Sequence, residues 1–213
     1  MQIKDERRRE MYEYLSSQIE VLFYNRTLET MQLYTASKGE ILQDFLAVIE
    51  QGAELVRKFI DADEKQPVMY LHFSYLFSEV LRKKLVLKID YYDVRYFKDI
   101  NTVDSFWEYD KLFPYVSEDM EMLHGRLQKQ FIRFKEYEFY DIRMHYHFGV
   151  FLIMKEILRN MTAEKAFSEA ISAISGSEVT VLYGAYLDQA DVIGIIQDGV
   201  FRIPSELQLT EAD

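Results

Sequence analysis

Residues 37–60 read SKGEILQDFLAVIEQGAELVRKFI, and their spacing predicts an amphipathic helix. Ser37 followed by Glu40 matches a capping box, in which two side chains satisfy free backbone N–H groups at the start of a helix. Apolar residues then recur at steps of four and three, which is the period of one helix face. Gly52 falls on this face, where the missing side chain would let a neighbouring helix approach closely. A helix packed against other helices is therefore the expected basic unit of the fold.

The helical period continues on the N-terminal side of this segment. It predicts a helix over residues 5–34, with an apolar stripe that includes Tyr14, Val21, Tyr24 and Leu28. We expect this stripe to face the core.

On the C-terminal side three more helices are expected. One starts at Pro67, a residue that suits the first helical position, and places His72 between Met69 and Leu76 on an apolar face. A long helix is predicted over residues 117–160, and a shorter one follows Thr162. Residues 90–114 show no sustained period and are interpreted as short turns and helical pieces.

The C-terminal forty residues fit two structures. Their apolar spacing fits a helix, but β-branched residues from Val179 onward and the pair Asp198-Gly199 between apolar runs favour strands and a hairpin. We predict a mainly α fold, with one helical domain over residues 1–213 and long helices. Residues 178–203 are expected to form a small irregular or β-hairpin appendage, and residues 204–213 a loose tail.

Charge and composition exclude several classes of function. The chain has 25 basic and 36 acidic residues, a net charge of −11, which repels nucleic-acid phosphates and anionic membrane surfaces. No apolar stretch reaches the roughly 20 residues of a membrane span. The charged N-terminus lacks the apolar core of a signal peptide. The chain has no cysteine, which fits a reducing compartment, and we expect a cytoplasmic protein.

Motifs for nucleophilic catalysis, phosphate binding and dinucleotide binding are absent from the sequence. One polar group interrupts an apolar stripe of the helix predicted over residues 117–160. Glu138, Asp141 and His145 are spaced by three and four, so their side chains would project from one helix face. Buried carboxylates need a counter-ion, a proton or a cation.

Two interpretations of this group remain open. Glu138, Asp141 and His145 could bind a divalent metal, with His72 as a further ligand if it points at His145. Alternatively, Arg133, Arg143 or a residue from another helix pairs with the carboxylates, and His72 is a core histidine. No cofactor is predicted beyond this candidate metal.

The first function hypothesis is therefore a non-catalytic interaction or regulatory module that binds a protein partner or a second copy of itself. The alternative is a helical bundle that binds a metal or a small ligand, or an enzyme, centred on Glu138, Asp141 and His145. A third hypothesis is a small-molecule sensor with an aromatic-lined pocket between helices. Nucleic acid and membrane are not expected partners.

Overall fold

A computed structural model describes residues 2–204, with side chains from residue 6 onward. The chain forms two compact units. Unit 1 is Met1–Ala36 with Asp110–Met154, and unit 2 is Ser37–Tyr109 with Lys155–Asp213. Whether both belong to one domain stays a prediction, and the predicted loose tail lies outside the described residues except for Pro204.

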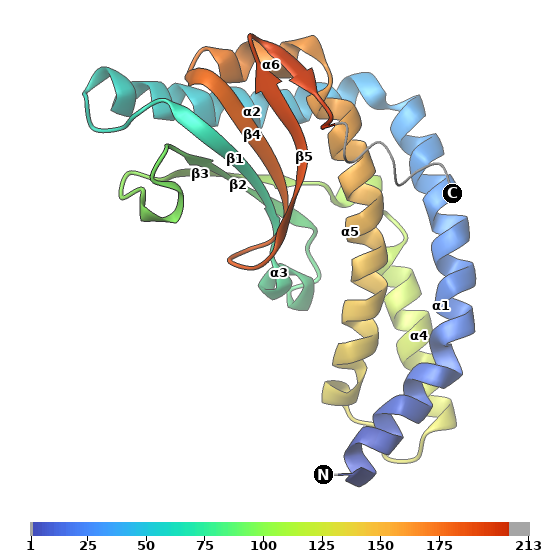
Figure 1. The fold of residues 1–213 in the computed structure, drawn as a ribbon. Helices are drawn as coiled ribbons and strands as arrows, with labels where there is room; N and C mark the ends of the chain where they lie inside the picture. The colour runs from blue at the N-terminus through green and yellow to red at the C-terminus, as the bar shows by residue number, and fades with distance from the viewer. Residues whose placement is uncertain (1, 205–213) are drawn as a thin grey trace. The chain divides into compact units, whose positions relative to one another are not determined.

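Unit 1 is helical. Its elements are α1 (Gln2–Ala36), the short turn η2 (Asp110–Leu112), α4 (Val116–Gln130), the short turn η3 (Glu136–Phe139) and the first part of α5 (Tyr140–Thr162). The first predicted helix is confirmed. The continuous helix predicted over 117–160 is wrong, because the backbone becomes extended at Phe131 and Arg133 has a positive φ of 56°. The break lets α5 run alongside α4 (Figure 1).

A buried ion pair joins the three helices of unit 1. Arg26 of α1 donates to both carboxylate oxygens of Asp119 on α4, at 2.9 and 2.7 Å. Tyr146 of α5 donates to the same carboxylate at 2.6 Å, and burial together with this bond raises the pKa of Tyr146. The guanidinium also lies over the Tyr115 ring, 4.4 Å from its centre. Removing one partner would leave a buried charge uncompensated, so this cluster fixes how the helices of unit 1 pack.

Unit 2 contains a six-stranded mixed sheet. Its strands are β1 (Val68–Tyr75), β2 (Val86–Tyr92), β3 (Val103–Glu108), β4 (Ser175–Ala185), β5 (Ala190–Gln197) and β6 (Val200–Arg202). The order is β3-β2-β1-β4-β5-β6, with β1 parallel to β4 and the other neighbours antiparallel. The prediction of a mainly α fold, an all-α helical bundle with only a small C-terminal hairpin, is therefore wrong.

The helix predicted from Pro67 is instead the strand β1. Met69, His72 and Leu76 fit a helical step, but Leu71 and Phe73 alternate with His72 and Ser74, and this period of two is the one the fold uses. Pairing with β2 on one edge and β4 on the other satisfies the backbone of β1 and outweighs the local pattern. The region predicted as turns and helical pieces contains the end of β2 and all of β3.

Residues 178–203 are strands, but they are not an appendage. Residue pairs such as Leu71–Val181 and Phe73–Tyr183 place β4 beside β1 in the middle of the sheet. The hairpin predicted at Asp198-Gly199 is confirmed as the β5–β6 turn, where both residues have positive φ, 52° and 73°. Asp-Gly suits such a turn because its backbone twist matches that of the strands it joins.

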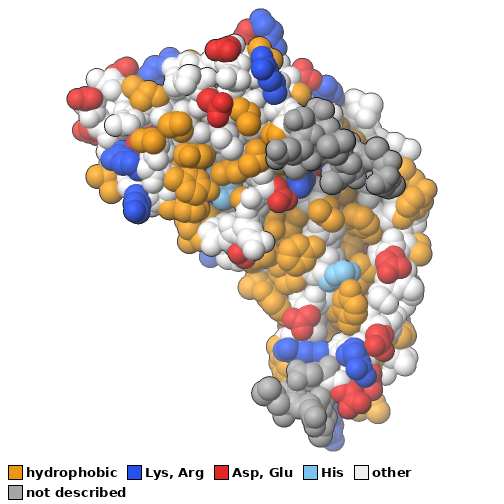
Figure 2. Space-filling model, viewed as in Figure 1, with side chains coloured by type: hydrophobic (Ala, Val, Ile, Leu, Met, Phe, Trp, Pro, Cys, Tyr) orange, Lys and Arg blue, Asp and Glu red, His pale blue; other side chains and the backbone are white. Residues whose placement is uncertain are grey.

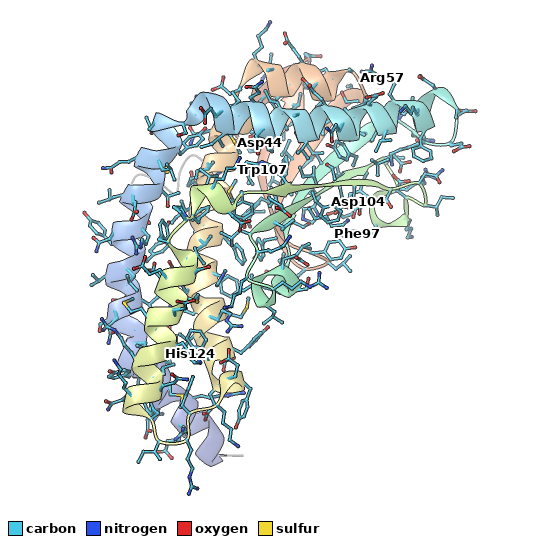
Figure 3. The ribbon with its side chains drawn as sticks, turned by 180° about the vertical axis from the view of Figure 1, so that it is seen from behind. Asp44, Arg57, Phe97, Asp104, Trp107 and His124 are labelled. Atoms are coloured by element: carbon cyan, nitrogen blue, oxygen red, sulfur yellow. The ribbon has the colours of Figure 1, made fainter. Side chains whose placement is uncertain are left out.

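Two helices cover one face of the sheet: α2 (Lys38–Asp61) and α6 (Lys165–Ser172). Phe45 of α2 contacts Phe73, Trp107 and Phe167, with ring centres 5.1 to 6.0 Å apart. The Trp107 indole donates to Asp44 at 3.0 Å, and both lie between α2 and β3 in Figure 3. Aromatic burial of this kind drives the packing of α2 and α6 on the strands. Two short helices, α3 (Phe77–Leu81) and η1 (Tyr96–Lys98), lie in the connections that flank β2.

Gly52 does permit a close approach, but by a tyrosine of the sheet and not by a helix. A Cβ atom at position 52 would lie 2.4 Å from the hydroxyl of Tyr91 and 2.5 Å from its ring. Tyr91 is fully buried and donates from this position to the Ile49 carbonyl at 3.2 Å. The glycine therefore makes room for the Tyr91 ring under α2.

We expect Gly52→Ala to lower the free energy of unfolding by about 1–3 kcal/mol, because overpacking outweighs the helix propensity of alanine. Urea denaturation measures the change. Gly39→Ala is the matched control on α2, since nothing lies within 4 Å of the added Cβ, and it should be neutral or stabilising. Equal effects at both positions would contradict this packing.

Candidate functional site

The second face of the sheet, away from α2 and α6, carries polar side chains at its centre. Alternation along the strands directs Leu71 and Phe73 toward the helices and their neighbours to the other side. Figure 2 shows this side of unit 2, where side chains coloured as hydrophobic, a class that includes tyrosine, gather over the strands. We call this side the polar face after the residues at its centre, which are Tyr70, His72 and Ser74 of β1 with Lys88, Asp90 and Tyr92 of β2.

Strand register brings these residues together. His72 is directly opposite Asp90, and Ser74 is opposite Lys88. Opposite residues in an antiparallel pair have Cβ atoms about 5 Å apart. On the other edge of β1, Leu182 and Gly184 of β4 are opposite His72 and Ser74 and present no polar side chain. The imidazole, the hydroxyl and the carboxylate therefore share one small area of the sheet.

Three of these side chains are buried without full hydrogen bonding. His72, Ser74 and Asp90 are at most 1% exposed. Both ring nitrogens of His72, the Ser74 hydroxyl and the Oδ2 atom of Asp90 have no hydrogen-bond partner in the described part of the chain. An unsatisfied buried donor or acceptor costs about 1–3 kcal/mol, so most buried polar groups in proteins are paired. Four such atoms on adjacent positions are a marked departure from that rule.

Lys88 supplies the positive charge of the polar face, and two carboxylates already neutralise it. Its ammonium group donates to Asp90 and lies 3.3 Å from Asp104 of β3. It also lies 4.7 Å from the centre of the Tyr186 ring. The polar face therefore has no free cation to attract an anion.

Burial controls the protonation of the central residues. Desolvation, with the nearby Lys88 charge, lowers the pKa of His72 to about 4, so its imidazole is neutral at physiological pH. Desolvation also raises the pKa of Asp90, although the hydrogen bond from Lys88 opposes this effect. A neutral imidazole offers one donor and one acceptor.

An aromatic cluster borders the polar centre. Tyr96 packs against Tyr70 and Tyr92, with ring centres 4.8 and 5.1 Å apart, and Phe97 lies 5.5 Å from Tyr92. Tyr96 has a φ of +52°, which is rare for a bulky residue and indicates that its surroundings hold it in place. Phe97 is half-exposed and, like Asp104, lies on the side of β3 away from α2 in Figure 3.

A buried ion pair holds the β2–β3 connection that carries Tyr96 and Phe97. The ammonium of Lys65 donates to Asp99, and both side chains are fully buried. Asp99 also accepts from the backbone N–H groups of Asp93 and Asn101, at 3.2 and 3.0 Å. Arg95 binds Asp93 with two side-chain nitrogens. The aromatic border is therefore a preorganised part of the polar face.

The serine, histidine and aspartate of the polar face are not linked as a nucleophilic triad. A serine, a histidine and a carboxylate are the components of a nucleophilic triad, but a triad needs each member hydrogen-bonded to the next. Here neither nitrogen of His72 bonds to Ser74 or Asp90. The low pKa of His72 also makes its imidazole a weak base.

The group predicted from the sequence lies in unit 1, where each member contacts a side chain of α1. Arg7 donates to Glu138 at 2.7 Å, and this bond lowers the pKa of Glu138. Arg8 lies 3.5 Å from the half-exposed Asp141. His145 packs edge-on against Tyr12, 5.0 Å between ring centres.

Arg7 and Arg8 thus pair with the two carboxylates from another helix, which is one of the arrangements that the alternative interpretation allows. His72, the fourth candidate ligand, belongs to β1 of unit 2. No three His, Asp or Glu side chains among residues 6–204 are grouped as they would be around a metal ion. The metal site stays a prediction to which these contacts lend no support.

Sequence reasoning identified His72 but missed Ser74, Lys88 and Asp90. The detectable signal was the alternation of polar and apolar residues in 71–75 and in 87–91. In each segment leucine, isoleucine or an aromatic residue alternates with a residue that can form hydrogen bonds. Interpreting the segment that starts at Pro67 as a helix hid the first of these two patterns.

We expect the free energy of unfolding to fall as the pH is lowered from about 6.5 to 4. In this window the unfolded chain protonates His72, whose ordinary pKa is 6.5, while the folded chain keeps it neutral. Above pH 7 His72 should contribute nothing to the pH dependence of this free energy, because it is neutral in both states. Urea denaturation across pH measures the slope, and His72→Leu is the control because it keeps the carboxylates and His147. Identical slopes for both proteins would contradict the lowered pKa.

Comparisons with known proteins do not assign the chain to a group. No family model matches it, and no curated protein and no solved structure does so either.

Proposed function

We propose that this protein is a non-catalytic regulatory module that binds a small uncharged ligand on the polar face of its sheet. The observation that supports this is the set of four unpartnered polar atoms on His72, Ser74 and Asp90. A ligand that pairs with them would recover the hydrogen bonds that folding leaves unmade. Ligand sites in general combine an apolar lining with a few convergent polar groups.

Charge argues for an uncharged ligand. The single lysine of the polar face is neutralised by Asp90 and Asp104, and the whole chain carries a net charge of −11. An anion would meet acidic neighbours without a free cation, and burying an unpaired charge is costly. A neutral donor–acceptor edge matches the neutral imidazole of His72.

The aromatic residues that border the polar centre favour a planar ligand. Tyr70, Tyr96 and Phe97 offer ring faces and edges beside the polar centre. Phe106 of β3 is half-exposed on the same side as Lys88. Aromatic side chains stack well on flat heterocycles and carboxamides. The proposed ligand class is therefore a neutral heteroaromatic or amide-bearing ring.

The proposal includes a cytoplasmic location, which the absence of cysteine supports. Among the described residues, no helix combines the length and apolarity that crossing a membrane requires. A regulatory role fits a site whose serine, histidine and aspartate are not hydrogen-bonded to one another as a proton relay for catalysis would be.

Two matched pairs of probes test the proposal by isothermal titration calorimetry. Nicotinamide and nicotinate share a ring and differ in charge, as do uracil and orotate. We expect at least one neutral member to bind, and its acid to bind about tenfold more weakly or not at all, since an unpaired buried charge is penalised. Tighter binding of the acids, or no binding by any of the four, would contradict the proposed ligand class.

Two variants locate the binding. His72→Leu removes both ring nitrogens and should abolish the heat of binding. Val200→Ala is the control, because Val200 is half-exposed on β6, three strands away from β1, and it should bind as the wild type does. Unchanged binding by His72→Leu would place the ligand elsewhere.

A further inference from the structure

The helix α1 has two apolar faces. In the described structure one is buried and the other is largely exposed, although Tyr14 at its start packs edge-on against Phe131, with 5.8 Å between ring centres. Its buried face, which packs inside unit 1, includes Met11, Leu15 and Ile19. The opposite face exposes apolar side chains: Tyr14 is 37% exposed, Val21 62%, Tyr24 67% and Leu28 50%. These are the residues expected from the sequence to face the core, and that expectation is wrong. We call this exposed face the α1 seam.

The spacing of the α1 seam is that of a helix–helix interface. Tyr14, Val21 and Leu28 recur every seven residues, and Ser17, Tyr24 and Met31 follow each of them by three. This is the alternation of positions a and d in a heptad repeat, which faces another helix and not solvent. The seam covers 18 residues, about 27 Å at roughly 1.5 Å per residue.

The residues beside the seam indicate its partner. One edge carries Glu13 and Glu20, whereas the other carries the uncharged amides Gln18, Asn25 and Gln32. The uncharged edge lies beside a cation, because Arg126 of α4 donates to the side chain of Gln18. The two edges of one molecule are therefore complementary to each other in charge.

We propose that the α1 seam binds the α1 seam of a second copy of this chain, in a parallel two-fold dimer. In a parallel pair, the residues that precede each position a (position g) face the partner's residues that follow each position d (position e). The glutamates of one copy, at g, therefore meet the edge of the other copy that carries Gln18 and Arg126. An antiparallel pair would place glutamates against glutamates, which is unfavourable. This inference does not depend on the polar face or its ligand.

Disulfide cross-linking tests the dimer and its direction, since the natural chain has no cysteine. Ser17→Cys places one thiol in a d layer, where a parallel dimer brings the two copies together. Oxidation should give a covalent product of twice 25.5 kDa on a non-reducing gel. Ser16→Cys is the control, because Ser16 is one residue away but off the seam and should cross-link at least about tenfold less, given the short reach of a disulfide.

Sedimentation velocity tests the apolar contact independently. Leu28→Glu should weaken the dimer by about 100-fold or more, because it buries a charge in the seam. Ile132→Glu, at an 84% exposed site of unit 1 that is not part of the α1 seam, should leave the dimer unchanged.

A wild type that sediments as a monomer would overturn the proposal, as would equal cross-linking at positions 16 and 17. Loss of the dimer in both glutamate variants would overturn it too, because the effect would then be one of charge and not of the seam.

Discussion

The pairing of β1 on both edges is the constraint on which unit 2 depends. With β2 on one side and β4 on the other, the strand cannot shift by one residue without exchanging its two faces. Such a shift would turn Leu71 and Phe73 away from Phe45 and bury His72 under α2. The aromatic contacts with α2 and α6 therefore fix the register, and the register fixes which polar side chains meet on the second face.

The polar face follows from this arrangement, and its composition works against stability. The sheet would be more stable if apolar residues occupied the positions of His72 and Ser74, since both are buried and leave polar atoms unpaired. By contrast, the buried carboxylate of Asp99 in the β2–β3 connection is well paired, because it binds Lys65 and two backbone amides. Within one unit the chain satisfies buried charges at the border and leaves the centre unsatisfied. Proteins commonly depart from local rules at their functional sites.

Local patterns predicted what local interactions determine. The helix over 5–34, the helix after Ser37 and the Asp198-Gly199 turn are confirmed, because backbone bonds and turn geometry within a few residues stabilise each of them. The capping hydrogen bond predicted from the Ser37 side chain is not made.

Patterns failed where distant partners decide the structure. The strand β1 depends on β4, about one hundred residues later in the chain, and a short apolar segment with mixed period does not reveal that partner. The prediction that the apolar stripe of α1 faces the core failed for a similar reason. Two faces of the helix are apolar, and the sequence does not show which of them is buried. For the candidate site, His72 was identifiable as a buried histidine, but its neighbours Ser74 and Asp90 required the register.

If His72 serves binding and not stability, the free energy of unfolding of His72→Leu near pH 7 should exceed that of the natural chain. We expect a gain of about 1–3 kcal/mol, because leucine removes two unsatisfied polar atoms at similar volume. Leu71→Ala, on the opposite face of the same strand, should instead lose about 2–5 kcal/mol and shows that the measurement detects the packing of β1. A loss of stability in His72→Leu would contradict the account, because it would mean that the imidazole stabilises the sheet without any ligand.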